Sequence, residues 1–222
     1  MALIQGVFLL RRHILKTVVF CDFDGTITVE ETFIGSLSQL ISDEEMSYWG
    51  KKLATGEMNI KQCTQALFST VPSSKRGLVE EYAGTVHVRP GFREFLKMAK
   101  EKGMEVIVLS AGIKWMQEII LAPYMDLITD FISGTLDTSG EYMDFSSEYS
   151  DDTEVLNKSF VMAEIEYDKA ICIGDGVVDL TMAAVSDTIF ARADLAKHLD
   201  EQGKAYIPYE DFYDIKKSIE NM

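Results

Sequence analysis

Two aspartates stand where the first apolar stretch of the chain ends. Residues 18–21 are apolar and β-prone, and Asp22, Asp24 and Gly25 follow at once. A continuous apolar run of this kind is typical of a strand buried on both faces, and the glycine marks its end. Asp is rare in strands, and burying an unpaired carboxylate is costly. A carboxylate pair at such a position indicates a site for chemistry, although a plain Asp-Gly turn is the simpler alternative.

Two later apolar runs end in polar residues that could join this pair. One run ends at Ser110 and the other at Asp175, with Asp179 four positions further on. Strands and helices that alternate along a chain predict a parallel sheet, and the carboxyl ends of its strands meet at one edge. We therefore expect these side chains in the same crevice as Asp22 and Asp24.

Several carboxylates in one crevice repel each other and resist ionising together. A divalent cation relieves this repulsion, and an all-oxygen ligand set favours Mg²⁺. Asp175 and Asp179 can hold such a cation or orient its waters. The sequence has no His or Cys cluster that would favour zinc. We therefore predict Mg²⁺ as the cofactor.

Carboxylates, Mg²⁺, a hydroxyl and a lysine together suit phosphoryl transfer. Asp22 can attack phosphorus and form an aspartyl phosphate. Asp24 can protonate the leaving oxygen and then activate water. Ser110 and the N–H groups near Gly112 can hold phosphate oxygens, and a lysine can offset their charge. The predicted reaction is the transfer of a phosphoryl group.

The elements that would position these residues alternate along the chain. We expect strands over residues 17–22, 105–110, 169–175, 188–191 and 205–207. We expect helices over residues 92–102, 115–121, 155–165 and 179–185, and a hairpin of 131–136 with 141–145. Residues 30–83 carry apolar residues at helical spacing. The predicted fold is α/β, with a Rossmann-like doubly wound parallel sheet core and an inserted all-helical cap subdomain.

Four motifs resemble, in order and spacing, those of the haloacid dehalogenase-like superfamily of aspartate-nucleophile phosphatases. They are Asp22-Phe-Asp-Gly-Thr-Ile-Thr, Val108-Leu-Ser-Ala-Gly, Leu156-Asn-Lys-Ser and Ile173-Gly-Asp-Gly-Val-Val-Asp. The resemblance covers nearly the whole chain. It makes Lys158 the expected catalytic lysine, with Lys169 as the other candidate.

The resemblance also implies a role for each residue. Asp22 is the nucleophile, Asp24 is the acid and base, and Lys158 completes the catalytic set. Asp22, the carbonyl of Asp24 and Asp175 would hold Mg²⁺, and Asp179 would lie behind them. Contacts with phosphate are expected at Thr26, Ser110, Ala111, Gly112 and Lys158. Residues 30–88 would form the cap, between core segments 17–29 and 89–222, after an extension over residues 1–16.

Within the superfamily the chain is similar to the phosphoserine phosphatase-like branch. Segments 89–95, 190–192 and 206–213 resemble the methionine-salvage phosphatases that act on 2-hydroxy-3-keto-5-methylthiopentenyl 1-phosphate. Phosphoserine phosphatase proper is the alternative. Glu31 matches its amine-binding acid, but Gln65 stands near its carboxylate-binding Arg. Contact of Glu31 and Gln65 with substrate stays an open question at this point.

Charge and composition restrict the partners. Lys and Arg number 21 against 36 Asp and Glu, a formal charge of −15, which argues against nucleic acid or an anionic membrane. No apolar run is long enough to span a bilayer, and three separated cysteines favour a reducing compartment. We expect a cytoplasmic monomer or homodimer that acts on a small phosphorylated metabolite. The apolar and basic residues 1–16 leave an organelle as the alternative.

Two other functions use the same residues or the same fold. A phosphotransferase or mutase would pass through the same aspartyl phosphate to an alcohol acceptor. A regulatory binding module would keep the fold without the reaction, and the presence of both Asp22 and Lys158 argues against it.

Overall fold

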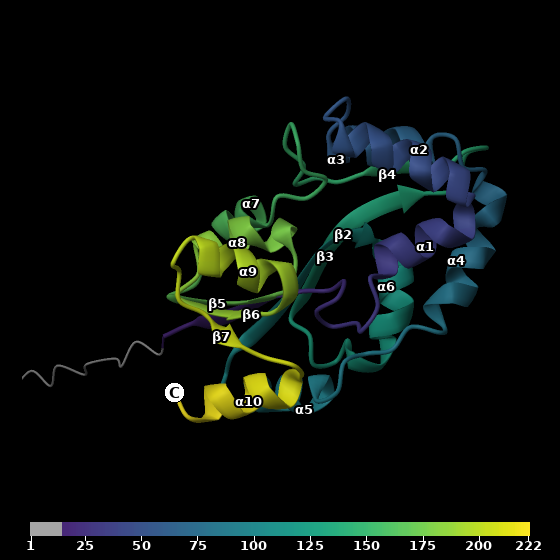
Figure 1. Cartoon of the computed structure of the whole chain (residues 1–222). Helices are drawn as coiled ribbons and strands as arrows, with labels where there is room; N and C mark the ends of the chain where they lie inside the picture. The colour runs from purple at the N-terminus through teal and green to yellow at the C-terminus, as the bar shows by residue number, and fades with distance from the viewer. Residues whose placement is uncertain (1–14) are drawn as a thin grey trace, which may run out of the picture.

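A seven-stranded sheet forms the centre of the protein in the computed structural model, which describes residues 15–222 (Figure 1). The strand order is β4-β3-β2-β1-β5-β6-β7, and all neighbours are parallel except β3 and β4. The strands are β1 (Thr17–Asp22), β2 (Glu105–Ile113), β3 (Asp130–Asp137), β4 (Asp144–Ser146), β5 (Lys169–Gly174), β6 (Thr188–Ala191) and β7 (Ile207–Pro208). The predicted doubly wound α/β fold is confirmed. The expected extension 1–16 lies, except for its last two residues, outside the described residues.

Helices cover both faces of the sheet because the central strands are apolar on both sides. In β1, Val18 and Phe20 face one layer while Val19 and Cys21 face the other, and all four are fully buried. This alternation follows from the period of two in a strand. The first layer contains α7 (Lys158–Ala163), α8 (Leu180–Ala184) and α9 (Ala193–Glu201); the second contains α5 (Phe92–Glu101), α6 (Lys114–Leu121) and α10 (Phe212–Glu220).

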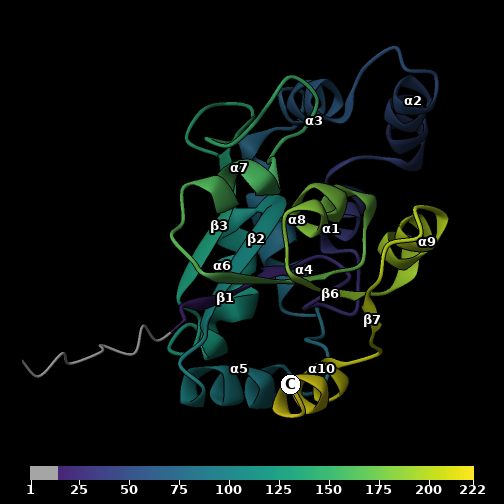
Figure 2. The ribbon, with the colours of Figure 1, turned by 90° about the vertical axis from the view of Figure 1, so that its left-hand side faces the viewer.

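The segment between β1 and α5 forms four helices that lie at the right and upper right of Figure 1; α2 and α3 are at the top of Figure 2. They are α1 (Thr32–Leu40), α2 (Asp43–Ala54), α3 (Ile60–Phe68) and α4 (Arg76–Ala83), with a 3₁₀ turn at Ser73–Lys75. Capping boxes at Ser42 and Asn59 start α2 and α3. The ring of Phe68 stacks on Phe145 of β4 at 5.3 Å. Helix α3 therefore packs on β4 of the β3–β4 hairpin.

Four predicted elements differ from the structure. The strand predicted over residues 205–207 is only the two-residue β7. The hairpin of β3 and β4 is present, but β3 also pairs with β2 and so extends the main sheet. Strand β2 runs past Ser110 to Ile113 through an irregularity in its pairing with β3. The helix predicted over residues 155–165 is only Lys158–Ala163, because the side chain of Asn157 accepts the N–H of Ser159 and caps the helix there.

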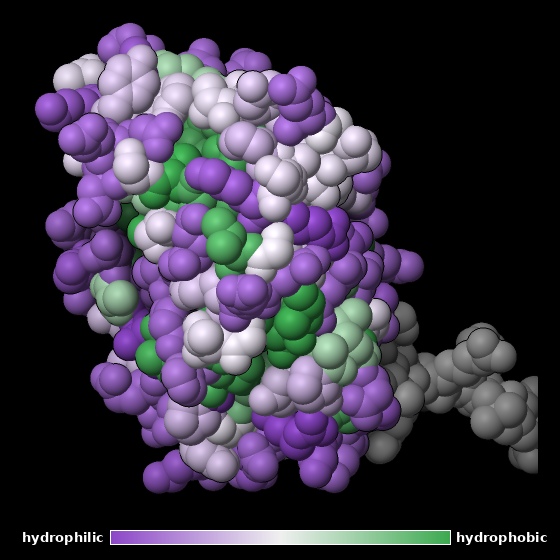
Figure 3. All heavy atoms as spheres, turned by 90° about the vertical axis from the view of Figure 1, so that its right-hand side faces the viewer, coloured by the Kyte–Doolittle hydropathy of each residue, from purple (hydrophilic) through white to green (hydrophobic). Residues whose placement is uncertain are grey.

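The described residues 15–222 contain no helix that is both long and apolar enough to cross a membrane. The face drawn in Figure 3 is mostly hydrophilic, and apolar side chains show between the polar ones in small patches and recesses. Scattered apolar exposure of this kind is normal for a folded domain.

Candidate active site

The turn after β1 brings two carboxylates to the carboxyl edge of the sheet. Asp22 is the last residue of the strand and is 4% exposed. Gly25 has a φ of +74°, and a Cβ there would collide with the side chains of Asp175 and Glu31. Only glycine suits a position with this conformation and so little space. The sequence places the turn correctly, and the turn brings Gly25 and Thr26 against Asp175 at the end of β5.

A lysine lies between two of the carboxylates. The Nζ of Lys158 donates to Asp22 and, at 2.5 Å, to Asp179, and its side chain is buried. Burial alone would lower the pKa of this lysine, but the two carboxylates raise it, so Lys158 is an ammonium ion. Lys169, the other candidate, is exposed at the start of β5, away from this pair.

One lysine does not balance the acidic charge of the site. Oxygens of Asp22, Asp175 and Asp179 lie within 4.8 Å of one another, and all three residues are buried. Burial, followed by the nearby Asp179, raises the pKa of Asp175 to about 6. The same two causes raise the pKa of Asp22, and Lys158 opposes them. A buried oxygen cluster with excess negative charge suits a hard divalent cation.

Asp179 already has partners for both of its oxygens. One accepts from Lys158, and the other accepts the backbone N–H groups of Asp175 and Gly176 at 2.9 and 3.0 Å. Thr26 donates its hydroxyl to Asp175 at 2.9 Å. Asp179 and Thr26 are therefore placed to orient the acidic cluster, and their side chains are fully buried.

Asp24 is held on the opposite side of the site by four donors. One oxygen accepts from the hydroxyl of Thr32 and, at 3.0 Å, from the N–H of Phe33. The other accepts from Ser110 at 3.1 Å and more distantly from Gln117. Burial raises the pKa of Asp24, and these hydrogen bonds only partly offset the rise. Asp24 is thereby fixed close to Asp22 with an increased tendency to hold a proton.

Ser110 and Gly112 are engaged with each other and with a polar network that the sequence did not reveal. The N–H of Gly112 donates to the Ser110 hydroxyl at 3.0 Å, and the Gln117 amide donates to the same oxygen at 2.6 Å. Ser133 donates to the Gln117 carbonyl at 2.5 Å. Because Gln117 and Ser133 lie outside every motif, no pattern in the sequence pointed to them.

Two arginines secure the turn that carries Asp24. Arg89 is 7% exposed and donates to the carbonyls of Gly25, Thr26 (2.9 Å) and Thr28 (3.1 Å). Arg192 donates to the carbonyl of Gly25 at 3.0 Å. The sequence pattern does not predict this function of the two arginines, although Arg89 directly precedes the Pro-Gly pair that starts the second part of the core.

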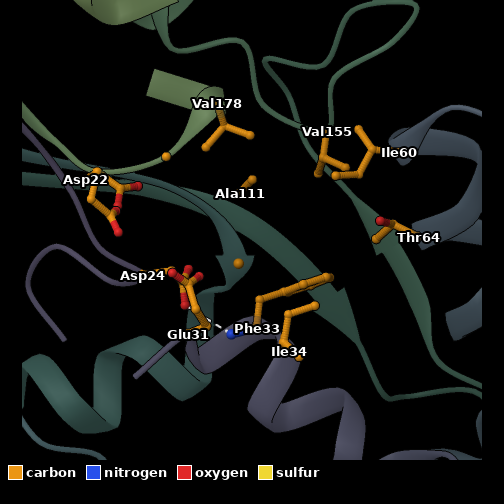
Figure 4. Close-up of a pocket in the computed structure, with 13 residues that line it drawn as sticks. Asp22, Asp24, Glu31, Phe33, Ile34, Ile60, Thr64, Ala111, Val155 and Val178 are labelled. Atoms are coloured by element: carbon orange, nitrogen blue, oxygen red, sulfur yellow. Dashed lines mark hydrogen bonds between the residues drawn. The ribbon is translucent and has the colours of Figure 1, made fainter. Parts of the chain in front are cut away.

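These residues surround a pocket of about 200 Å³ (Figure 4). Asp22, Asp24 and Glu31 lie on one side of it, and Ile60, Thr64 and Val155 face them across the space. Of the other expected residues, Ala111, Gly112 and Asp175 also line the pocket. Four more of the expected residues are buried behind its wall: Lys158, Asp179, Ser110 and Thr26. Gln65 is exposed, and its amide donates weakly to the carbonyl of Phe145 at 3.5 Å, outside the pocket.

Helix α3 is tied to the loop that precedes Lys158. The N–H and the Nζ of Lys61 donate to the carbonyls of Thr153 and Asp151, at 3.3 and 2.6 Å. The Asn59 amide donates to the carbonyl of Asp152 at 2.9 Å. These bonds join the helical segment to the core on the side of the pocket that faces the two aspartates.

Residues 19–184 match the family of haloacid dehalogenase-like hydrolases. A protein of Microcystis aeruginosa strain NIES-843, named 2-hydroxy-3-keto-5-methylthiopentenyl-1-phosphate phosphatase, is 34% identical over 92% of this chain and 98% of its own. A protein of the same name from Geobacillus kaustophilus is 29% identical over 93% of this chain and 97% of its own.

Solved structures support the fold. A phosphoserine phosphatase described as a phospho-aspartyl intermediate analogue has a TM-score of 0.67 at 19% identity, over 94% of this chain and 99% of its own. A substrate-bound phosphoserine phosphatase has a TM-score of 0.69 at 20% identity, over 91% and 98%.

The chain belongs to the haloacid dehalogenase-like hydrolase family. Its curated relatives are named as phosphatases. The prediction that the chain is a phosphatase of this superfamily is therefore confirmed.

Proposed function

We propose that the protein hydrolyses a phosphomonoester of a small metabolite through a covalent aspartyl phosphate (an acyl phosphate) on Asp22, with Mg²⁺ as cofactor. The observation that carries this proposal is the placement of Asp22 and Asp24 on one wall of the pocket. Lys158 lies behind Asp22, and four donors hold Asp24.

The reaction follows from the two carboxylates. An oxygen of Asp22 attacks phosphorus, the bond from phosphorus to the ester oxygen breaks, and Asp24 gives that oxygen a proton. Water then attacks the same phosphorus, Asp24 takes a proton from the water, and the bond to Asp22 breaks. The raised pKa of Asp24 supports its role as the acid of the first step. Lys158 favours the ionised form of Asp22 against the effect of burial.

The acidic cluster fits the expected Mg²⁺. Asp22 and Asp175 are buried, and their oxygens are close enough to share one ion. The carbonyl of Asp24 is the third ligand expected for this family, while Asp179 holds Lys158 and the loop after β5. When bound, the cation supplies positive charge against the phosphoryl oxygens.

The lining of the pocket favours an ester without a carboxylate. Its charged residues among those described are all acids: Asp22, Asp24, Glu31 and Asp175. A substrate such as phosphoserine would find no cation there for its carboxylate, and Gln65 does not line the pocket. We therefore place 2-hydroxy-3-keto-5-methylthiopentenyl 1-phosphate, the substrate in the names of the relatives, ahead of phosphoserine.

The proposal also assigns a role to the four helices between β1 and α5. Helices α1–α4 are the cap, because α1 and α3 supply the wall opposite the sheet and α3 is tied to the core loop.

The three cysteines are free and buried, which suits the reducing cytoplasm.

The proposal is tested by phosphate release from a panel of phosphorylated metabolites with Mg²⁺, including both named esters. We expect turnover of the keto ester, loss of turnover in EDTA, and loss in Asp22→Asn. The exposed Asp126→Asn serves as the control and should keep full activity. Unchanged turnover in Asp22→Asn would rule out the nucleophile, and metal-independent turnover would rule out Mg²⁺.

A further inference from the structure

A second, apolar groove of about 350 Å³ lies between α1, α2 and α3. No charged side chain among residues 15–222 lines it. Its lining is Phe33, Ile34, Leu37, Met46, Trp49, Gly50, Leu53, Ile60, Cys63, Thr64, Leu67 and Phe68.

Helix α2 leaves this groove open. The helix turns Met46, Trp49 and Leu53 toward the groove, yet none of its residues is fully buried. An amphipathic helix normally buries such a face against its neighbours. Leu53 is 40% exposed, and a Cβ added to Gly50 would meet no atom within 4 Å. Figure 2 shows α2 at the outer edge of the molecule.

The groove continues into the catalytic pocket. Phe33, Ile34, Ile60 and Thr64 line both spaces. In the pocket, Ile60 and Thr64 lie across from the aspartates (Figure 4). A molecule with its phosphate at Asp22 therefore meets, at its other end, the residues that open into the groove.

We propose that this groove binds the uncharged apolar tail of the substrate, so that the protein prefers phosphate esters whose tail extends beyond the catalytic pocket. The inference rests on the proposed phosphatase function. Continuity with the pocket and the lack of charge along the groove favour a substrate tail over a second copy of the chain, which is the competing occupant.

The test compares kcat/KM for n-alkyl phosphates from ethyl to octyl, with Mg²⁺ and below micelle-forming concentrations. Each methylene buried in the groove is expected to raise kcat/KM about fourfold, the effect of transferring one CH₂ from water. Gly50→Phe fills the groove and should remove this gain for the long esters. Gly77→Phe, at an exposed glycine of α4 with equally free space, is the matched control and should keep it.

Measurements of binding test this inference separately from the proposed hydrolysis. Calorimetry on Asp22→Asn with ethyl and octyl phosphate measures tail recognition even where hydrolysis fails. Tighter binding of octyl phosphate that Gly50→Phe abolishes would support the groove. Equal affinity for both esters, or the same loss in Gly50→Phe and Gly77→Phe, would overturn it. Sedimentation that shows a dimer dispersed by Gly50→Phe would assign the groove to a second copy and also overturn it.

Discussion

Replacing Lys158 by Met would remove the ammonium ion that joins Asp22 to Asp179 while keeping a side chain of similar length. The three side chains are 1%, 6% and 0% exposed, so water has little access to the carboxylates left behind. Removing one partner of a buried ion pair costs about 3–5 kcal/mol. For a chain of 222 residues this corresponds to a fall in Tm of about 10 °C.

The loss of stability in Lys158→Met should depend on pH in a defined direction. Burial and Asp179 already raise the pKa of Asp22, and removal of the ammonium raises it further. A carboxyl whose pKa is higher in the folded state stabilises the fold at low pH and loses that contribution as pH rises through the folded value. The deficit of Lys158→Met is therefore largest at neutral pH and shrinks toward pH 5. Mg²⁺ should restore part of it.

Urea unfolding in EDTA at pH 5 and pH 7, followed by tryptophan fluorescence, measures this effect. Lys169→Met is the control, because that lysine is exposed, and its cost should stay within about 0.5 kcal/mol. In an Asp179→Asn background the cost of Lys158→Met should fall markedly. A loss below about 1 kcal/mol at pH 7, or one that grows as pH falls, would refute the buried ion pair as described.

Two substitutions and one pH titration test the residues that hold the turn, the metal and helix α3. Arg89→Met should lower the free energy of unfolding by about 2–4 kcal/mol in urea titrations, since charged donors to buried carbonyls are lost; recovery of full stability by Arg89→Lys would contradict a role for the guanidinium fork. Mg²⁺ affinity, measured by calorimetry, should fall about tenfold per pH unit below pH 6, because Asp175 must lose its proton to bind; a flat profile would exclude Asp175 as a ligand. Lys61→Met should raise KM severalfold by loosening α3 from the core loop, and Lys51→Met, on exposed α2, should leave KM unchanged.

The sequence was most informative where local rules are broken. Asp22 at the end of an apolar strand and Gly25 after it were sufficient to locate the turn, and the structure gives Gly25 a positive φ. Motif order was sufficient to place Lys158 rather than Lys169 beside Asp22. These features can be recognised in the sequence because a charged residue in an apolar run is unfavourable and so indicates a functional site. A glycine at such a place indicates a conformation that other residues rarely adopt.

Features that depend on long-range packing stayed hidden. Arg89 and Gln117 donate hydrogen bonds to Thr26 and Asp24, which lie far away in sequence, and the local sequence around each residue does not indicate these partners. The pairing of β3 with β2 was missed because the 131–145 region looks complete as a hairpin. The groove beside α2 arises from how loosely one amphipathic helix packs, which periodicity does not reveal.

In the proposed reaction Asp22 becomes phosphorylated during turnover. The variant Asp24→Asn with p-nitrophenyl phosphate should trap this intermediate, since this leaving group needs no acid but release of phosphate from Asp22 needs the base. Acid quenching followed by mass spectrometry of peptides should find one phosphoryl group on Asp22 and none in the double variant that also carries Asp22→Asn. A phosphoryl group on another residue, or turnover with no labelled protein at any time, would contradict the account.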